Sequence, residues 1–299
     1  MADWDDLRVF LAVARAESLS RAGRVLKVDP ATVGRRVARL EEALGARLFV
    51  KGPQGYALTD EGARLLARAE RAEQAVTGAL EEARGGTGAL SGQIRIGAPD
   101  GCATFVLPQV VAAICDANPG LEVQIVALPR VFNLSKREAD MAIAVSRPEA
   151  GRLTVQKITD YHLHLAASRA YLSRHPPIRT PADLKGHRFV GYIADMIFDK
   201  ELDYLGEVGA GAVPLASNSV SVQLNWVRGG AGVAVVHDFA LPSAPEAVKV
   251  LDGQVGLTRA FYLIRHADDR RVERLNRFAD LLAQGVRREV ARLEGLTPA

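Results

Sequence analysis

Residues 18–49 constrain the fold of this chain more than any other stretch, because they encode two helices joined by a tight turn. They read SLSRAGRVLKVDPATVGRRVARLEEALGARLF. Ser20 is a good N-cap for the first helix. The inward face of that helix is expected to carry Ala22, Val25 and Leu26. After the turn, Asp29 is expected to cap the second helix, with Pro30 at its first helical position.

The second helix has two faces of different character. Its apolar residues recur at helical spacing and are expected to pack inward: Val33, Val37, Leu40 and Leu44. A neighbouring face is polar and basic: Thr32, Arg35, Arg36 and Arg39. Such a helix fits the major groove of DNA, where arginine contacts guanine edges or phosphates. The alternative is an ordinary helix with a solvated basic face.

The overall charge does not decide between these alternatives. The 299 residues have a formal net charge of +3, so any affinity for nucleic acid must come from local clustering. Residues 1–58 hold ten Lys and Arg against seven Asp and Glu, which is a modest excess. The arrangement of the arginines therefore carries the argument.

Five motifs give this region a resemblance to a known family. They are LRVF at 7–10, AESLSRAG at 16–23, VDPATVGRRVARLE at 28–41, LGARLF at 44–49 and LTDEG at 58–62. Together they resemble the winged helix-turn-helix of LysR-type transcriptional regulators. The chain departs from the family at Asp29, where Ser-Gln-Pro is frequent. A carboxylate there would repel phosphate, so Asp29 is expected to cap the helix and not to contact DNA.

The resemblance implies a wing and a set of DNA-binding residues. Residues 48–50 and 56–58 are predicted to be two short strands, joined by the turn-forming residues 51–55. Such a wing lies over the DNA backbone or the minor groove. The predicted DNA-binding residues are Ser20, Arg21, Pro30, Ala31, Thr32, Arg35, Arg36, Arg39, Lys51 and Gln54.

Two further helices are predicted on either side of these elements. The first covers residues 4–15, with Leu7, Phe10, Leu11 and Ala14 inward. The second is capped by Thr59, runs to about residue 83 and precedes the glycine-rich linker 85–88. Its seam of mostly small residues is expected to pair with a second copy of the chain: Leu65, Ala69, Ala72, Val76 and Leu80. The alternative is packing of this helix on the C-terminal domain of its own chain.

After residue 91 the pattern changes to strands alternating with helices, which predicts parallel α/β architecture. Two units of this kind resemble the periplasmic-binding-protein-like effector domain of the same family. The predicted fold is thus multidomain: an all-α winged helix-turn-helix with a small β wing, a long linker helix and a two-lobed α/β domain. The expected boundaries are 1–59 for DNA binding, 60–90 for the linker and dimerisation helix, and 91–295 for effector binding. Lobe I would take about 91–160 and 265–295, and lobe II about 161–264.

An effector is expected beyond the carboxyl ends of the strands. The candidate residues are Asp100, Cys102, Thr104, Arg130, Ser146, Arg147, Tyr192, Ser217, Ser219 and His237. The serines either hold a ligand carboxylate at a helix start or simply cap that helix. Asp100 favours a neutral effector or an amine, whereas Arg130 and Arg147 favour an anion. The sequence leaves the charge of the effector open.

Other classes of site have little support in the sequence. No nucleophile elbow, zinc-protease helix, P-loop or Cys-x-x-Cys pair occurs, so we expect no catalytic residues, metal or cofactor. His162 and His164 share one strand face without a third ligand in view, which favours packing over metal binding. Cys102 and Cys115 are expected to be free thiols. Cys102, placed before a helix, has a less favoured alternative as a redox sensor with a lowered pKa.

The sequence predicts a cytoplasmic, effector-responsive, DNA-binding regulator of transcription. Its expected partners are double-stranded promoter DNA, a small-molecule effector, a second copy of the chain and, for an activator, RNA polymerase; no membrane partner is expected, since no run approaches a membrane span. The resemblance also implies a homotetramer and a target that includes its own promoter. The two alternatives are a solute-binding protein with an N-terminal oligomerisation module and an enzyme acting between the lobes.

Overall fold

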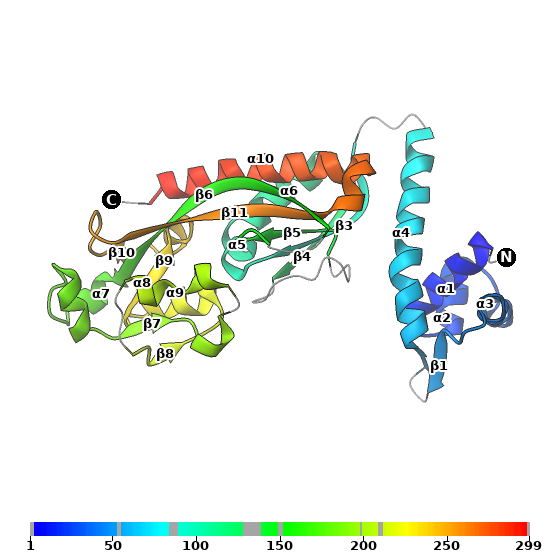
Figure 1. The fold of residues 1–299 in the computed structure, drawn as a ribbon, viewed down its shortest axis with the longest axis horizontal. Helices are drawn as coiled ribbons and strands as arrows, with labels where there is room; N and C mark the ends of the chain where they lie inside the picture. Colours follow the sequence, from blue (N-terminus) through cyan, green and yellow to red (C-terminus); the bar gives the residue numbers. More distant parts are fainter. Residues whose placement is uncertain are drawn as a thin grey trace. The chain divides into compact units, whose positions relative to one another are not determined.

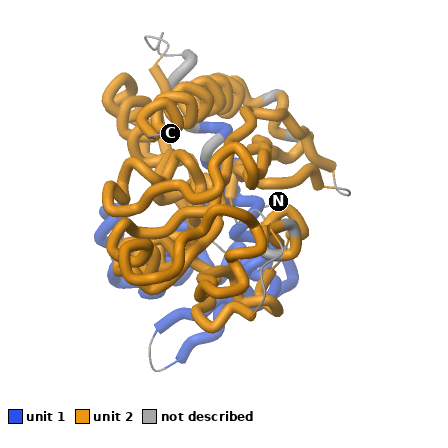
Figure 2. Tube along the Cα trace, turned by 90° about the vertical axis from the view of Figure 1, so that its left-hand side faces the viewer, with its two compact units in different colours: residues 1–88 blue, residues 89–299 orange. Residues whose placement is uncertain are grey.

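The computed structural model describes residues 3–52, 55–83, 89–127, 139–148, 152–197, 199–208 and 212–297. The chain forms two compact units, residues 1–88 and residues 89–299, which are coloured separately in Figure 2. Unit 1 therefore contains the predicted DNA-binding region together with the long helix that follows it.

Unit 1 begins with three helices: α1 (Trp4–Ala16), α2 (Leu19–Leu26) and α3 (Pro30–Leu44) (Figure 1). The Asp29 carboxylate accepts a hydrogen bond from the Thr32 amide at 2.8 Å, so its predicted capping role is confirmed. The predicted cap of α2 was wrong, because Ser18 accepts the capping bond from Arg21 and the helix begins at Leu19. Ser20 lies within the first turn of α2 and is exposed.

The predicted apolar faces of α2 and α3 are buried only in part. Ala22, Val33, Val37 and Leu40 are buried, as predicted. Val25 is 75% exposed, because α2 buries its Ala22–Gly23 face and Val25 lies roughly 200° around the helix from Gly23. Leu44 is 44% exposed because it is the last residue of α3, one turn beyond the core.

The wing is an antiparallel hairpin of β1 (Phe49–Gly52) and β2 (Gly55–Leu58). Gly55 needs to be glycine, since it has a φ of +127° and a Cβ there would lie 2.3 Å from the carbonyl oxygen of Glu17. The buried Glu41 carboxylate accepts bonds from the amides of Leu48 and Phe49, at 2.7 and 3.2 Å. Glu41 thus ties the end of α3 to the start of the wing.

Helix α4 (Asp60–Ala83) completes unit 1. The Thr59 hydroxyl accepts a bond from the Gly62 amide at 2.9 Å and donates to the Arg47 carbonyl at 2.7 Å, which confirms the predicted start of this helix. Gly62 lies so close to the wing that a Cβ on it would be 2.1 Å from the Leu48 carbonyl oxygen.

Unit 2 is built on one mixed sheet with strand order β4-β3-β5-β11-β6-β9-β7-β8, and β10 pairs with β6. The strands are β3 (Ser91–Ala98), β4 (Gly120–Ala127), β5 (Met141–Ala144), β6 (Leu153–Ser168), β7 (Phe189–Gly191), β8 (Leu215–Ala216), β9 (Val233–His237), β10 (Ala247–Lys249) and β11 (Gly256–His266). The two ends of the sheet are parallel, as predicted. The centre differs, because β6 and β11 form a long antiparallel pair.

This central pair determines how the two halves of unit 2 join. Strand β11 pairs with β5 from Tyr262 to Arg265, and its register on β6 shifts between Phe261 and Tyr262. The sequence pattern marked only the buried parts of these strands, at 163–167 and 261–264. Their remaining residues face solvent on one side and therefore lack a continuous apolar run.

The helices of unit 2 are α5 (Asp100–Phe105), α6 (Leu107–Asp116), α7 (Arg169–Leu172), α8 (Tyr204–Glu207), α9 (Val220–Arg228) and α10 (Glu273–Gly295). Short 3-10 turns occur at Pro181–Gly186, Ala194–Met196, Lys200–Leu202, Asp238–Ser243 and Ala267–Arg271. Helix α10 runs along β6 (Figure 1) and packs on α6, where Gly285 faces Val110. The helix predicted at 134–138 lies outside the described residues.

Candidate functional site

Two carboxylates of α1 bind two of the three arginines on the basic face of α3. The Arg36 guanidinium donates to Asp5 at 2.8 Å, and Arg39 Nε donates to Asp6 at 2.6 Å. Asp6 is only 2% exposed, so Arg39 neutralises a buried charge. The hydrogen bond from Arg36, aided by nearby arginine charges, holds the pKa of Asp5 below its usual value. Both arginines therefore stabilise the packing of α1 on α3.

Arg35 is the α3 arginine that is left for a ligand. Its guanidinium is exposed and donates to the Thr32 hydroxyl at 2.9 Å, with no carboxylate contact among the described residues. The Thr32 hydroxyl donates in turn to Asp29 at 2.6 Å. These bonds hold Thr32 in place on the first turns of α3, beside the exposed guanidinium of Arg35.

The other predicted DNA-binding residues lie at the surface of unit 1. Ser20 and Arg21 are exposed on α2, Pro30 and Ala31 are exposed at the start of α3, and Lys51 is exposed on β1. Gln54 lies outside the described residues. The exposed residues thus lie at the start of α2, at the start of α3 and on the wing.

The predicted dimer seam on α4 requires a correction. Ala69 is 1% exposed, and Ala69, Leu65 and Leu66 belong to the core of unit 1. Arg15 of α1 also pairs with Glu73 of α4 at 2.6 Å. The first half of α4 therefore packs on its own DNA-binding unit, which neither the predicted seam nor its alternative foresaw.

The rest of the seam has a different environment. Val76 is 40% exposed and Ala72 is half-buried, and the side chain of Leu80 lies outside the description. Of the described seam residues, Ala72 and Val76 therefore stay available to a partner.

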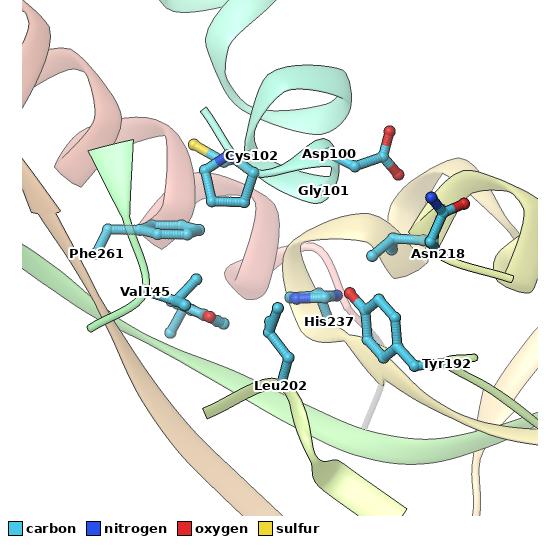
Figure 3. Close-up of a pocket in the computed structure, with 12 residues that line it drawn as sticks. Asp100, Gly101, Cys102, Val145, Tyr192, Leu202, Asn218, His237 and Phe261 are labelled. Carbon is cyan, nitrogen blue, oxygen red and sulfur yellow. The ribbon is translucent and has the colours of Figure 1, made fainter. Parts of the chain in front are cut away.

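Unit 2 contains a pocket between α5, α9 and the centre of the sheet (Figure 3). It is small and partly open to solvent. Four predicted effector residues line it: Asp100, Cys102, Tyr192 and His237. The wall also includes Val145, Tyr161, Leu202, Asn218 and Phe261, which were not among the predicted effector residues. Phe261 was predicted only as a strand residue and Tyr161 was assigned to no element, because no local signal marked a role of either in a pocket.

The serines at the start of α9 bind a carboxylate of the protein itself, that of Asp100. The Ser219 hydroxyl donates to Asp100 Oδ2 at 3.0 Å, and the Ser221 amide donates to the same oxygen at 3.3 Å. Ser219 also accepts a bond from the Val222 amide, so it caps α9 as well. Asp100 therefore occupies the anion position that one of the two sequence-based alternatives gave to a ligand carboxylate.

The other predicted effector residues that the structure describes do not line the pocket. Thr104 accepts a bond from the Ser221 hydroxyl, and Ser146 donates to Asp199. Ser217 accepts from the Ser219 amide at 3.1 Å, and Arg147 is exposed. Arg130 lies outside the described residues. Apart from Arg130, these side chains are thus engaged with the protein or directed to solvent.

The pocket is aromatic and holds an unsatisfied polar atom. The Tyr161 ring stacks on Phe261 with centroids 4.2 Å apart, and on His237 at 5.6 Å. Among the described residues, His237 Nδ1 is buried without a hydrogen-bond partner. Buried polar groups of this kind call for a partner, such as a ligand or water.

Burial of His237 predicts an acid sensitivity of unit 2. Burial lowers the pKa of His237 from 6.5 to about 4. Below about pH 6.5, His237 is protonated in the unfolded chain but stays neutral in the folded chain. The free energy of unfolding therefore falls as the pH drops below about 6.5, by about 3 kcal/mol near pH 4. We expect His237→Asn to lose less stability over this range than the wild type in urea unfolding. Equal losses in the two proteins would refute the assignment.

The environments of Cys102, His162 and His164 indicate structural roles. Burial raises the pKa of the Cys102 thiol well above its usual value, so the alternative of a reactive thiolate was wrong. His162 pairs with Glu294, and His164 pairs with Asp238, both at 2.8 Å. No group of three metal-binding side chains occurs in the described part of the chain. The described helices also include none that is long and apolar enough to cross a membrane.

Comparison with known proteins identifies the family that both units match. Residues 4–63 match the model of the bacterial regulatory helix-turn-helix proteins of the lysR family, and residues 87–287 match the LysR substrate binding domain. The transcriptional regulator PtxR of Pseudomonas aeruginosa is 28% identical over 78% of this chain and 76% of its own length. CrgA of Neisseria meningitidis, also a transcriptional regulator, is 24% identical over 94% of this chain and 96% of its own.

Solved structures agree on the fold. A full-length OxyR variant from Pseudomonas aeruginosa superposes with a TM-score of 0.67 at 18% identity, covering 96% of this chain and 98% of that one. The α3 surface, the pocket in unit 2 and the two family matches lead to one conclusion. The chain belongs to the LysR-type family of transcriptional regulators, with a helix-turn-helix DNA-binding domain followed by an effector-binding domain.

Proposed function

We propose that Arg35 reads a base edge in the promoter DNA and that occupation of the pocket in unit 2 controls this binding. The observation that carries the proposal is the division of the α3 arginines. Arg36 and Arg39 pair with Asp5 and Asp6, whereas Arg35, near the N-terminal end of the recognition helix, has no carboxylate partner among the described residues. Residues at that end of a recognition helix contact base edges in the major groove.

We also propose that the protein acts as a homodimer, or as a tetramer of two dimers. A dimer supplies two reading heads for the two half-sites of an operator. The exposed Val76 on the part of α4 beyond Ala72 supports a role of that segment in pairing. If the protein activates transcription, RNA polymerase is a further partner. The effector acts by binding one arrangement of the dimer better than another.

Substitution of Arg35 tests the DNA-binding proposal. DNA fragments are first selected from the source genome by the purified wild-type protein. Arg35→Ala is then expected to weaken binding to a selected fragment by about 1–3 kcal/mol, because a base contact is lost. A gel-shift titration measures this change. The matched control is Arg292→Ala, which removes an exposed arginine of α10 with the same change in charge.

The two groups of arginines should behave differently. Arg39→Ala leaves the buried Asp6 without its ion pair, so it is expected to lower the stability of unit 1 as well as affinity. Arg35→Ala should leave stability unchanged. Wild-type affinity in Arg35→Ala would contradict the proposed base contact. If the wild-type protein showed no salt-sensitive DNA binding, the solute-binding alternative would be favoured.

A further inference from the structure

We propose that the effector is an amine: a small compound with a protonated nitrogen that faces Asp100 and an aromatic or apolar body that lies among the rings of the pocket. This inference rests on the proposed effector-binding function of unit 2 and names the chemical class of the ligand. It follows from three features of the pocket, which are its charge, its occupied anion position and its aromatic wall.

Asp100 is the one charged side chain among the described residues that line the pocket, because the other ionisable groups there are neutral. Burial lowers the pKa of His237 to about 4, so this imidazole is uncharged at neutral pH. Burial and the negative charge of Asp100 raise the pKa of Tyr192, which keeps its hydroxyl protonated. Asp100 is therefore the charge that the described part of the wall presents to a ligand, while the nearby Arg259, outside this wall, pairs with Glu201 at 2.9 Å.

The anion position at the start of α9 is already filled. The donors of Ser219 and Ser221 both bind Asp100 Oδ2. A ligand carboxylate would have to displace Asp100 or lie beside it, and like charges at such distances repel. The other oxygen, Oδ1, makes no hydrogen bond to the described residues, so it is free to accept one from a ligand N–H. Figure 3 shows the Asp100 carboxylate beside Asn218, across from Tyr192.

The rest of the pocket suits an aromatic or apolar body and a cation. Tyr161, Phe261 and His237 form a stack, and Val145 and Leu202 add aliphatic surface. Aromatic faces attract cations as well as flat apolar groups. The pocket is small, so it admits only a small molecule. One polar atom on its body would satisfy the unpartnered His237 Nδ1.

A panel of matched compounds tests the class. Each set holds an amine, an alcohol and a carboxylic acid on the same body, for example 2-phenylethylamine, 2-phenylethanol and 3-phenylpropionate. Thermal shift of the full-length protein identifies binders, and calorimetry measures their affinity. We expect amines to dominate the hits. A set of hits dominated by acids or by alcohols, or the absence of any amine among the binders, would overturn the proposal.

The Asp100→Asn variant makes the test specific to the site. Asparagine still accepts the bonds from Ser219 and Ser221, so the start of α9 keeps its partner. We expect this variant to lose at least about tenfold in affinity for the amine hits and to lose its discrimination against acids. Ser217→Ala, near the same helix but outside the pocket wall, is the control. Equal amine affinity in wild type and Asp100→Asn would also refute the assignment.

The outcome separates this inference from the proposed function. An effector of another charge class would still shift DNA binding in a gel-shift assay, and then only the amine assignment fails. If the amine hits bind at Asp100 but leave operator affinity unchanged, the ligand class stands and effector control of DNA binding fails.

Discussion

Gly62→Ala is expected to destabilise unit 1 by about 3 kcal/mol and to abolish DNA binding at temperatures where the wild type binds. The reason is steric. A Cβ on Gly62 would lie 2.1 Å from the Leu48 carbonyl oxygen and 3.0 Å from the Leu58 side chain. Because the nearest atom is backbone, α4 and the wing must move apart to admit the methyl group.

The measurement can isolate unit 1. The chain has two tryptophans, Trp4 in unit 1 and Trp226 in unit 2. With Trp226 replaced by phenylalanine, the fluorescence of Trp4 reports urea unfolding of unit 1 alone. Gly34→Ala is the matched control, because its Cβ would meet only the Leu19 side chain at 3.4 Å. It should be neutral or stabilising. Equal stability of both variants would contradict the packing described for α4.

Phe261→Ala should cost unit 2 about 3–5 kcal/mol, the usual range for removal of a buried phenylalanine. Phe261 is 1% exposed, stacks on Tyr161 and lies where β11 changes its register on β6. Its loss opens a cavity next to the pocket and weakens the link between the two halves of the sheet. The variant should therefore also bind any ligand of the pocket more weakly.

Urea unfolding followed by Trp226 fluorescence, with Trp4 replaced by phenylalanine, measures this loss. The control is Val222→Ala on α9, which removes a 40% exposed side chain and should change stability by less than about 0.5 kcal/mol. A loss below about 1 kcal/mol in Phe261→Ala would show that the Tyr161–Phe261 stack is not part of the core.

Local signals made most of unit 1 predictable. Asp29 and Pro30 define the start of α3, Thr59 defines the start of α4, and the turn residues between two apolar runs define the wing. Ser18 and Ser20 were a harder choice. Both are good caps, two residues apart, and the decision depends on Leu19, whose side chain packs partly against the core. That contact is tertiary and is not visible in the local sequence.

The candidate sites were less predictable, because their partners are far apart in the chain. The sequence around Arg39 does not indicate that it pairs with Asp6, which is 33 residues away. The four residues of the basic face could therefore not be distinguished from the sequence. Tyr161 and Phe261 meet only because β6 and β11 pair antiparallel. The anion position at Ser219 was recognised, but its occupant, Asp100, is 119 residues away. Pairing over such distances is set by topology and not by spacing.

The central claim is that Arg35 of α3 reads a base. Guanine methylation interference on a selected fragment tests it most directly, since N7 methylation blocks a bidentate arginine contact. The account predicts that methylation of one guanine in each half-site inhibits binding of the wild type and has no further effect on Arg35→Ala. The same pattern of inhibitory guanines in both proteins would contradict it.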